Sequence, residues 1–270
     1  MNKVLVSSGV LALVLAVAEA HAAPTYGAPT GWSGIGTVGT NTPNNDVGAI
    51  PGGHSGYLFV STADAPSGGG NLLNQGEETN ASTLTSPLFS AKAGDVLEFY
   101  FNYVTSDGAG FADYGWARLL DAEGNEVALL FTARTVPSPD NIVPGTDMPS
   151  PDATLTPDVV SILAGSGEDG GPVWDELGDS SGDCYNDGCG LSGWVLSSYT
   201  IAEAGNYRLQ FGVTNWQDEG YNSGMAVAGA TIDGDPIDPP PPVSVPEPAS
   251  LALLGLGLLG LGCATRRRAG

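Results

Sequence analysis

The chain has 270 residues, with 30 acidic against eight basic side chains and a formal net charge of −22 at pH 7. So acidic a protein repels nucleic-acid phosphates and anionic lipid headgroups, which argues against nucleic acid as a partner. Its 40 glycines and 20 prolines, with no long stretch of helical apolar periodicity, favour many short strands joined by long turns.

Residues 1–22 have the pattern of an export signal. Lys3 supplies the positive charge, residues 10–18 form the apolar core, and 20–22 (Ala-His-Ala) make a small-x-small cleavage site, with the cut expected after Ala22. The apolar run is too short for a first membrane helix, and no charged stop follows it. The pattern predicts the Sec export machinery and signal peptidase as partners.

The body divides into a Gly/Pro-rich segment at 23–56, extended or loosely packed, and a folded domain at 57–234. Within 96–104, alternate residues Leu97, Phe99, Phe101 and Tyr103 share one face, as in a half-buried strand. Similar patterns predict strands at 57–62, 83–89, 96–104, 114–120, 126–134, 193–201, 207–213 and 225–232, and residues 155–163 fit either a short helix or a strand.

A turn followed by a core strand occurs twice in the body, at 90–99 and again at 201–211. A two-sheet sandwich can use such a unit once in each sheet. With about eight or nine strands in total, the body is predicted to be an all-β, jelly-roll-like β-sandwich. The fold prediction also includes an N-terminal signal helix before this sandwich and a C-terminal transmembrane helix after it.

Cys184 and Cys189 are the only cysteines outside the C-terminal apolar run. In an exported protein they are expected to form a disulfide, and closing so short a loop stabilises by about 2 kcal/mol on the chain-entropy model. Zinc is the weaker alternative, because His54 is the only histidine after the export signal and there is no second cysteine pair.

The chain closes with a Pro-rich linker at 235–244 and a three-part segment at 245–270. Its parts are Val245, Pro246, Glu247 and Pro248, then the apolar run 249–264, then Arg266, Arg267 and Arg268. As a helix the apolar run is about 24 Å long, near the lower limit for crossing a bilayer of about 30 Å. The arginines are expected on the cytoplasmic side and the body outside.

These 26 residues resemble the PEP-CTERM sorting signal of Gram-negative bacteria. The resemblance implies recognition by an exosortase-type membrane protease, processing near the Pro-Glu-Pro segment, and delivery to the envelope or exopolysaccharide matrix after transient membrane anchoring. An ordinary tail anchor is the alternative. The body is similar to β-sandwiches on other exported proteins of this kind, some of which resemble carbohydrate-binding modules; the likeness rests on 93–104, 102–107 and 212–233 and brings no catalytic motif.

Calcium is the predicted cofactor, because acidic residues follow or precede several predicted strands. Strand ends at one edge of a sandwich can converge, and Ca²⁺ takes six to eight oxygen ligands. Solvated acidic turns are the alternative interpretation. The candidate ligands are Asp107, Asp113, Asp218, Glu219 and Asp233.

Aromatic side chains exposed on a loop can stack on sugar rings, although tryptophan more often packs in a core. Acid-flanked, loop-like contexts mark three of the aromatic residues as candidates for a glycan-binding surface, ahead of Trp116 and Trp194. They are Trp174, Trp216 and Tyr221.

A Ser-His-Asp triad is hard to assemble with His54 as the only available base. The body is therefore predicted to be non-enzymatic: a structural, adhesive or polysaccharide-binding protein of the envelope or extracellular matrix. A secreted glycan hydrolase with a carboxylate pair is one alternative, with Glu98, Glu126 and Asp218–Glu219 as its least loop-like acids. A calcium-stabilised surface scaffold without a ligand is another.

Overall fold

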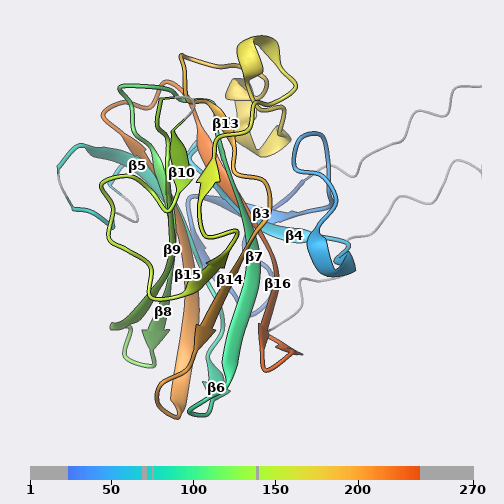
Figure 1. The fold of residues 1–270 in the computed structure, drawn as a ribbon, viewed down its shortest axis with the longest axis vertical. Helices are drawn as coiled ribbons and strands as arrows, with labels where there is room; N and C mark the ends of the chain where they lie inside the picture. Colours follow the sequence, from blue (N-terminus) through green and yellow to red (C-terminus); the bar gives the residue numbers. More distant parts are fainter. Residues whose placement is uncertain (1–23, 69–71, 75, 138–139, 238–270) are drawn as a thin grey trace, which may run out of the picture.

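The computed structural model describes residues 24–68, 72–74, 76–137 and 140–237, and the predicted export signal, transmembrane segment and sorting residues lie outside them. The fold is all-β, a jelly-roll-like sandwich as predicted, with long strands along one axis and loops gathered at the upper end of Figure 1. None of the described helices is long and apolar enough to cross a membrane.

Nine of the described strands have five residues or more, in agreement with the predicted eight or nine, and the others are short additions. The long strands are β3 (Thr37–Asn41), β4 (Tyr57–Ser61), β5 (Glu78–Thr85), β7 (Val96–Thr105), β8 (Tyr114–Asp121), β9 (Glu126–Arg134), β14 (Val195–Thr200), β15 (Gly205–Trp216) and β16 (Ser223–Ile232). The short ones are β1 (Thr25–Tyr26), β2 (Ser33–Ile35), β6 (Phe89–Ala91), β10 (Asn141–Val143), β11 (Thr154–Thr156), β12 (Val160–Ser161), β13 (Gly190–Leu191) and β17 (Asp235–Pro236).

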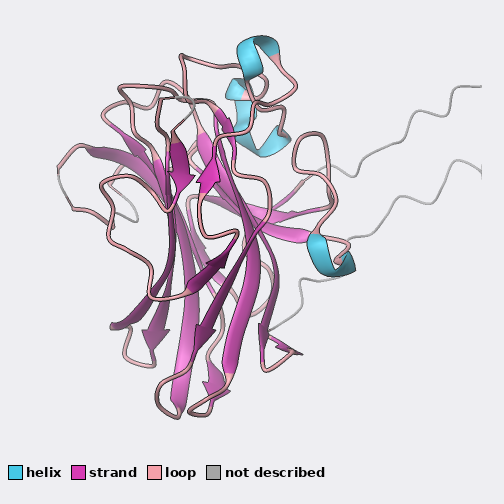
Figure 2. Cartoon of the chain, in the orientation of Figure 1, coloured by secondary structure: helices cyan, strands magenta, loops and turns pink. Residues whose placement is uncertain are grey.

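The strands form two main antiparallel sheets. One has the order β1-β3-β4-β16-β7-β14-β11, with β13 on β7 and β17 on β16; the other has the order β2-β5-β15-β8-β9, with β6 on β15. A separate pair joins β10 and β12. Three 3-10 helices, η1 (Pro51–Gly53), η2 (Glu168–Gly170) and η3 (Asp175–Ser180), lie in the loops (Figure 2).

The two strands with the clearest period-two pattern, β7 and β15, lie in different sheets and face each other across the core. Phe99 of β7 meets Phe211 of β15 edge-on, with ring centroids 5.3 Å apart. Phe101 stacks on Phe131 of β9 at 3.7 Å. Aromatic pairs of this kind contribute about 0.5–1.5 kcal/mol beyond the area that they bury.

The repeated turn-strand unit is used once in each sheet, as the sequence predicts. Its two turns also bond to each other at the lower end of the sandwich: the Gly94 N–H donates to the Ile201 carbonyl (2.8 Å), and the Ile201 N–H donates to the Asp95 carbonyl (2.9 Å). Gly94 has φ +94°, a left-handed conformation that favours glycine.

The N-terminal segment is part of the sandwich rather than a loose extension, which corrects the domain boundary expected at residue 57. β3 pairs with β4 in the nine-stranded sheet, and β2 pairs with β5 in the other sheet. The same holds for the start of the predicted linker, because β17 pairs with β16 and Ile237 is buried. These strands could not be predicted from composition, because segments rich in glycine and threonine show no apolar alternation. Their strand conformation comes from pairing with neighbouring strands.

A second apolar layer covers the outer face of the nine-stranded sheet. Trp174 and Leu177, from the long excursion between β12 and β13, pack with Val47 and Ile50 over Tyr57 of β4. The excursion therefore does not extend freely into solvent: it closes over the sheet and brings η3 to the upper end (Figure 1).

Candidate functional site

The five acids predicted to bind calcium lie at opposite ends of the sandwich. Asp107 follows β7, Asp113 precedes β8 and Asp218 follows β15, all at the upper end, where η3 also lies. Asp233 follows β16 at the lower end, and its Oδ1 accepts the Val96 N–H at 3.1 Å. The convergence prediction was therefore wrong for Asp233, because antiparallel neighbours β7 and β16 finish at opposite ends.

Asp113 is fully buried between the sheets and is held by two donors. Its Oδ1 accepts the Trp216 N–H and its Oδ2 accepts the Ser223 hydroxyl, both at 2.7 Å. Burial, with the nearby negative charge of Asp107, raises the pKa of Asp113 well above its ordinary value.

Asp107 is also buried, at 1% exposed. Its Oδ1 accepts the Gly108 N–H at 2.8 Å, while its Oδ2 has no partner. Burial raises the pKa of Asp107 to about 7; the Gly108 hydrogen bond opposes this rise and the Asp218 carboxylate adds to it. Two acids of the predicted set are thus brought together inside the protein, with Asp218 close enough to influence both.

Glu219 is exposed and accepts the Ser67 hydroxyl at 3.4 Å, so it does not join the buried pair. Among the described residues, no group of three or more Asp, Glu, His or Cys side chains is placed to hold a metal ion. The structure therefore does not assemble the five predicted ligands into one centre.

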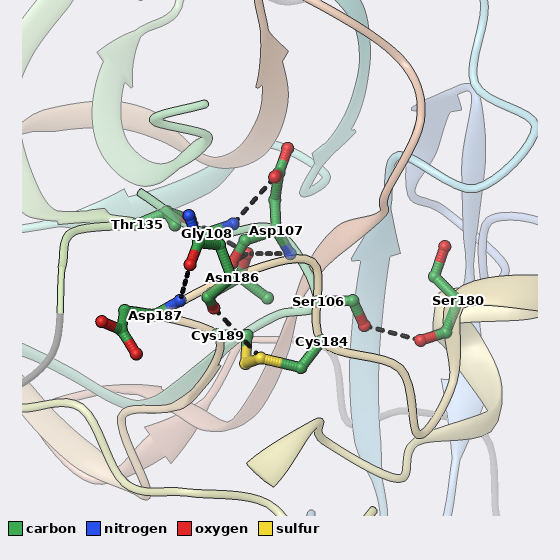
Figure 3. The surroundings of a disulfide bond; sticks show 10 residues. Ser106, Asp107, Gly108, Thr135, Ser180, Cys184, Asn186, Asp187 and Cys189 are labelled. Carbon is green, nitrogen blue, oxygen red and sulfur yellow. Dashed lines mark hydrogen bonds between the residues drawn. A yellow bond between two sulfur atoms is a disulfide. The ribbon is translucent and has the colours of Figure 1, made fainter. Parts of the chain in front are cut away.

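Cys184 and Cys189 are joined in a disulfide, with Cα atoms 5.6 Å apart (Figure 3). The loop that they close sits on the end of β7. The Tyr185 N–H donates to the Ser106 carbonyl at 3.0 Å, and the Ala109 N–H donates to the Asp187 carbonyl at 2.7 Å. Two backbone hydrogen bonds made by residues inside the loop therefore fix it to the sandwich.

Three rings make a row above this end of the sandwich, which we call the aromatic ledge: Phe111, Tyr185 and Tyr221. Tyr185 lies between the other two, with ring centroids 5.2 Å from Phe111 and 5.3 Å from Tyr221. Tyr185 is 46% exposed and its neighbours are half-buried. Of these three residues, only Tyr221 was predicted as a candidate. Phe111 and Tyr185 are each a single aromatic residue within a Gly/Asp-rich loop, which was the only sequence signal for them.

Trp174 and Trp216, the other predicted ligand-binding aromatics, are core residues, which corrects that prediction. Trp174 is fully buried, and its Nε1–H donates to the Tyr57 hydroxyl at 2.9 Å. Trp216 is 8% exposed and is covered by the Arg134 guanidinium, 4.8 Å from its ring. Acidic neighbours in sequence did not expose these rings, because the long excursion and Arg134 fold over them.

A polar cavity of about 560 Å³ adjoins the disulfide loop. Asp169, Asn186 and Asp187 line it together with Tyr185, whose ring belongs to the aromatic ledge. The cavity therefore places carboxylate and amide groups next to an exposed aromatic surface.

A second cavity, of about 340 Å³, lies over the nine-stranded sheet beside β16. Trp32, Leu58 and Ile237 make its apolar wall and His54 lies at its rim, exposed. None of the described residues that line it is acidic, so it offers no carboxylate pair.

Glu176 is a buried carboxylate that is not among the predicted site residues. Its Oε1 accepts Asn41 Nδ2 and the Tyr57 hydroxyl, both at 2.8 Å, and its Oε2 has no partner. Burial raises the pKa of Glu176 to about 7, and the two hydrogen bonds oppose the rise. The only local sequence signal of its burial was its position between two large apolar residues, Trp174 and Leu177.

Residues 244–268, beyond the described structure, match the family model of the PEP-CTERM protein-sorting motif. The chain carries a PEP-CTERM sorting motif. The match includes the seven residues of the predicted sorting motif, from Val245 to Arg268, and confirms the resemblance. A PEP-CTERM motif marks an exported, membrane-associated protein that an exosortase processes.

No curated protein matches the chain in sequence. Solved structures match the chain at low similarity. A carbohydrate-binding module, TmCBM61 in complex with β-1,4-galactotriose, is 10% identical over 75% of this chain and 90% of that one, with a TM-score of 0.32. The K3 cleaved adhesin domain of Lys-gingipain from Porphyromonas gingivalis is 12% identical over 79% and 98%, with a TM-score of 0.33.

The active domain of tailspike protein 4 of bacteriophage CBA120 is 12% identical over 75% of this chain, with a TM-score of 0.32. The chain spans only 19% of that tailspike.

Proposed function

We propose that this PEP-CTERM protein is a non-enzymatic protein of the cell surface or extracellular matrix that binds polysaccharide through the aromatic ledge. The observation that carries the proposal is the row of contacting rings, Phe111, Tyr185 and Tyr221, whose central ring belongs to the disulfide loop. Sorting by an exosortase delivers such a domain to the compartment where the cell's own polysaccharide is found.

The chemistry of the ledge suits a sugar chain. Pyranose rings have an apolar C–H face that packs on aromatic rings, and tyrosine supplies rigid contact area with few rotamers to fix. Asp169, Asn186 and Asp187 line the adjoining cavity and can accept or donate hydrogen bonds to sugar hydroxyls. A neutral or basic glycan suits the acidic surroundings best, since the net charge of −22 repels anionic chains.

The placement of the acids favours binding over hydrolysis. A glycosidase needs two carboxyl groups facing one scissile bond. Glu98 lies on β7 and Glu126 on β9, in different sheets, and Glu126 is paired with Arg118 at 3.5 Å. Asp107, Asp113 and Glu176, whose pKa values are raised, are all buried and out of reach of a polymer.

Retention of the exported protein on the cell's own exopolysaccharide, in affinity electrophoresis, tests the proposal. Tyr185→Ala and Tyr221→Ala each remove one ring of the ledge, and we expect roughly tenfold weaker binding, equivalent to about 1.4 kcal/mol. Tyr26→Ala is the matched control, because Tyr26 is 60% exposed and packs edge-on against Phe59 on β4.

Equal retention of all three variants would contradict a role for the ledge. Release of reducing ends from the polysaccharide would instead support the hydrolase. Absence of any retention by the wild type, on any glycan of the native envelope, would leave a scaffold without a ligand as the better description.

A further inference from the structure

The space between the sheets is polar at the upper end, in contrast to the aromatic core below it. Antiparallel pairing brings these residues together: Thr105 of β7 lies opposite Ser223 of β16, and Asp113 bonds to both Ser223 and the Trp216 N–H. The buried polar side chains of this layer are Asn80, Thr105, Asp107, Asp113, Asn215 and Ser223.

Asn215 points into this layer and has no partner. Leu209, Phe211 and Val213 of β15 are core residues, so the alternation of a strand sends Asn215 to the same inner side. Asn215 is 1% exposed, and neither its Oδ1 nor its Nδ2 is hydrogen-bonded. Buried amide atoms are normally hydrogen-bonded, so two that lack any protein partner need an explanation, of which a bound ion is one.

Two more oxygens of the layer lack a partner, Asp107 Oδ2 and Asn80 Oδ1. Asn80 lies on β5, inward like Leu84 of the same strand, next to the end of β15. In Figure 3 the Asp107 side chain points away from the disulfide. Oxygens without a partner therefore occur on β5, on β15 and directly after β7. Trp216, the residue after Asn215, donates its N–H to Asp113 Oδ1 and so places the end of β15 beside Asp113.

The layer also contains two carboxyl groups without a basic partner. The only ion pair among the described residues joins Arg118 and Glu126. Arg134 donates to the carbonyls of Ala112 and Thr146 and covers Trp216, so it does not neutralise Asp113. Buried carboxylates are costly unless something positive compensates them.

We propose that Asp107, Asp113 and Asn215 hold a divalent cation, Ca²⁺, between the sheets beneath the disulfide loop. The donors are carboxylate, amide and hydroxyl oxygens, which are the ligands of Ca²⁺, whereas zinc and copper prefer nitrogen and sulfur. Neutral oxygens complete the coordination, so three acidic ligands are not needed. The cation links β7, β8 and β15 under the aromatic ledge, and this inference does not depend on the glycan proposal.

Metal analysis and thermal unfolding of the exported protein test the proposal. After EDTA and dialysis, added Ca²⁺ at a hundred times its dissociation constant is expected to raise Tm by roughly 5–10 °C. Mg²⁺ at the same concentration is expected to act more weakly, since it demands smaller, near-octahedral geometry. One equivalent of calcium should accompany the untreated protein in elemental analysis.

The variant Asp107→Asn distinguishes loss of cation binding from loss of the fold. The amide removes a buried charge, so this variant in EDTA should melt at or above the metal-free wild type, yet it should lose the response to Ca²⁺. Asp233→Asn, at the lower end, is the control and should keep the full response. A wild-type Tm that ignores both EDTA and Ca²⁺, or a Ca²⁺ response retained in Asp107→Asn, would overturn the proposal.

Discussion

Replacement of Glu176 by glutamine probes how a buried carboxylate of the outer layer is held. Glu176 lies in η3 and is 1% exposed; only one of its two oxygens is hydrogen-bonded. Glutamine has nearly the same shape and keeps an Oε1 acceptor for Asn41 and Tyr57. The substitution therefore removes the titration of this group and little else.

The magnitude follows from the pKa of Glu176, raised by burial from 4.5 to about 7. Because the folded protein holds this proton more tightly than the unfolded chain, the acid costs nothing below pH 4.5. The cost grows between pH 4.5 and 7 and is complete above 7. At about 1.4 kcal/mol per pH unit, the gap corresponds to about 3 kcal/mol of lost stability.

We therefore expect Glu176→Gln to be about 2 kcal/mol more stable than the wild type at pH 8, since the new amide N–H lacks an acceptor and costs about 1 kcal/mol. At pH 4 the wild-type carboxyl is neutral, and the variant should be about 1 kcal/mol less stable. Urea unfolding of both proteins from pH 4 to 8.5, in EDTA so that bound cations do not contribute, measures the difference.

Asp179→Asn is the control, because Asp179 is exposed in the same 3-10 helix. Asp179→Asn removes one carboxylate of the same helix from the surface and gives the baseline against which the pH dependence of Glu176→Gln is compared. If the stability difference between Glu176→Gln and the wild type follows this baseline between pH 4.5 and 7, the assignment of a raised pKa to Glu176 is wrong.

Two further predictions concern packing and the disulfide. A Cβ on Gly212 would clash with the Trp116 ring, so Gly212→Ala should lower the free energy of unfolding in urea by about 1–3 kcal/mol. Gly48→Ala, whose Cβ would lie in open space, should change it little, and equal effects of the two substitutions would refute the close contact. Replacing Cys184 and Cys189 together by serine should cost about 2 kcal/mol and lower Tm by roughly 4–8 °C in calorimetry, and an unchanged Tm would mean that the loop is equally ordered without its bond.

The strands were predictable from sequence where apolar residues alternate within the strand itself. β9 has the predicted bounds 126–134, and β7 and β15 extend the predicted 96–104 and 207–213 by a few residues. Such alternation can be seen among neighbouring residues, so it is visible in the sequence even when the partner strand is unknown. β2 and β3 were missed because their glycines and threonines acquire a strand conformation through pairing with β5 and β4.

The candidate site was predicted only in part for the same reason. The structure places Asp107, Asp113 and Tyr221 at one loop-rich end, whereas Asp233 belongs to the other end and Trp174 to a buried layer. A residue type and its neighbours do not reveal which distant segment will cover it. Phe111 and Tyr185 became candidates only when the fold placed their rings in contact.

The sequence by itself determined that this protein carries a sorting signal, because such a motif is read along the chain as an ordered run of proline, apolar and arginine residues. Only the tertiary structure decided which polar and aromatic side chains face solvent. The Asn41–Glu176 hydrogen bond joins residues 135 positions apart, and the Trp174–Tyr57 bond spans 117. Burial depends on such long-range contacts, and these two exist only when η3 packs on the nine-stranded sheet.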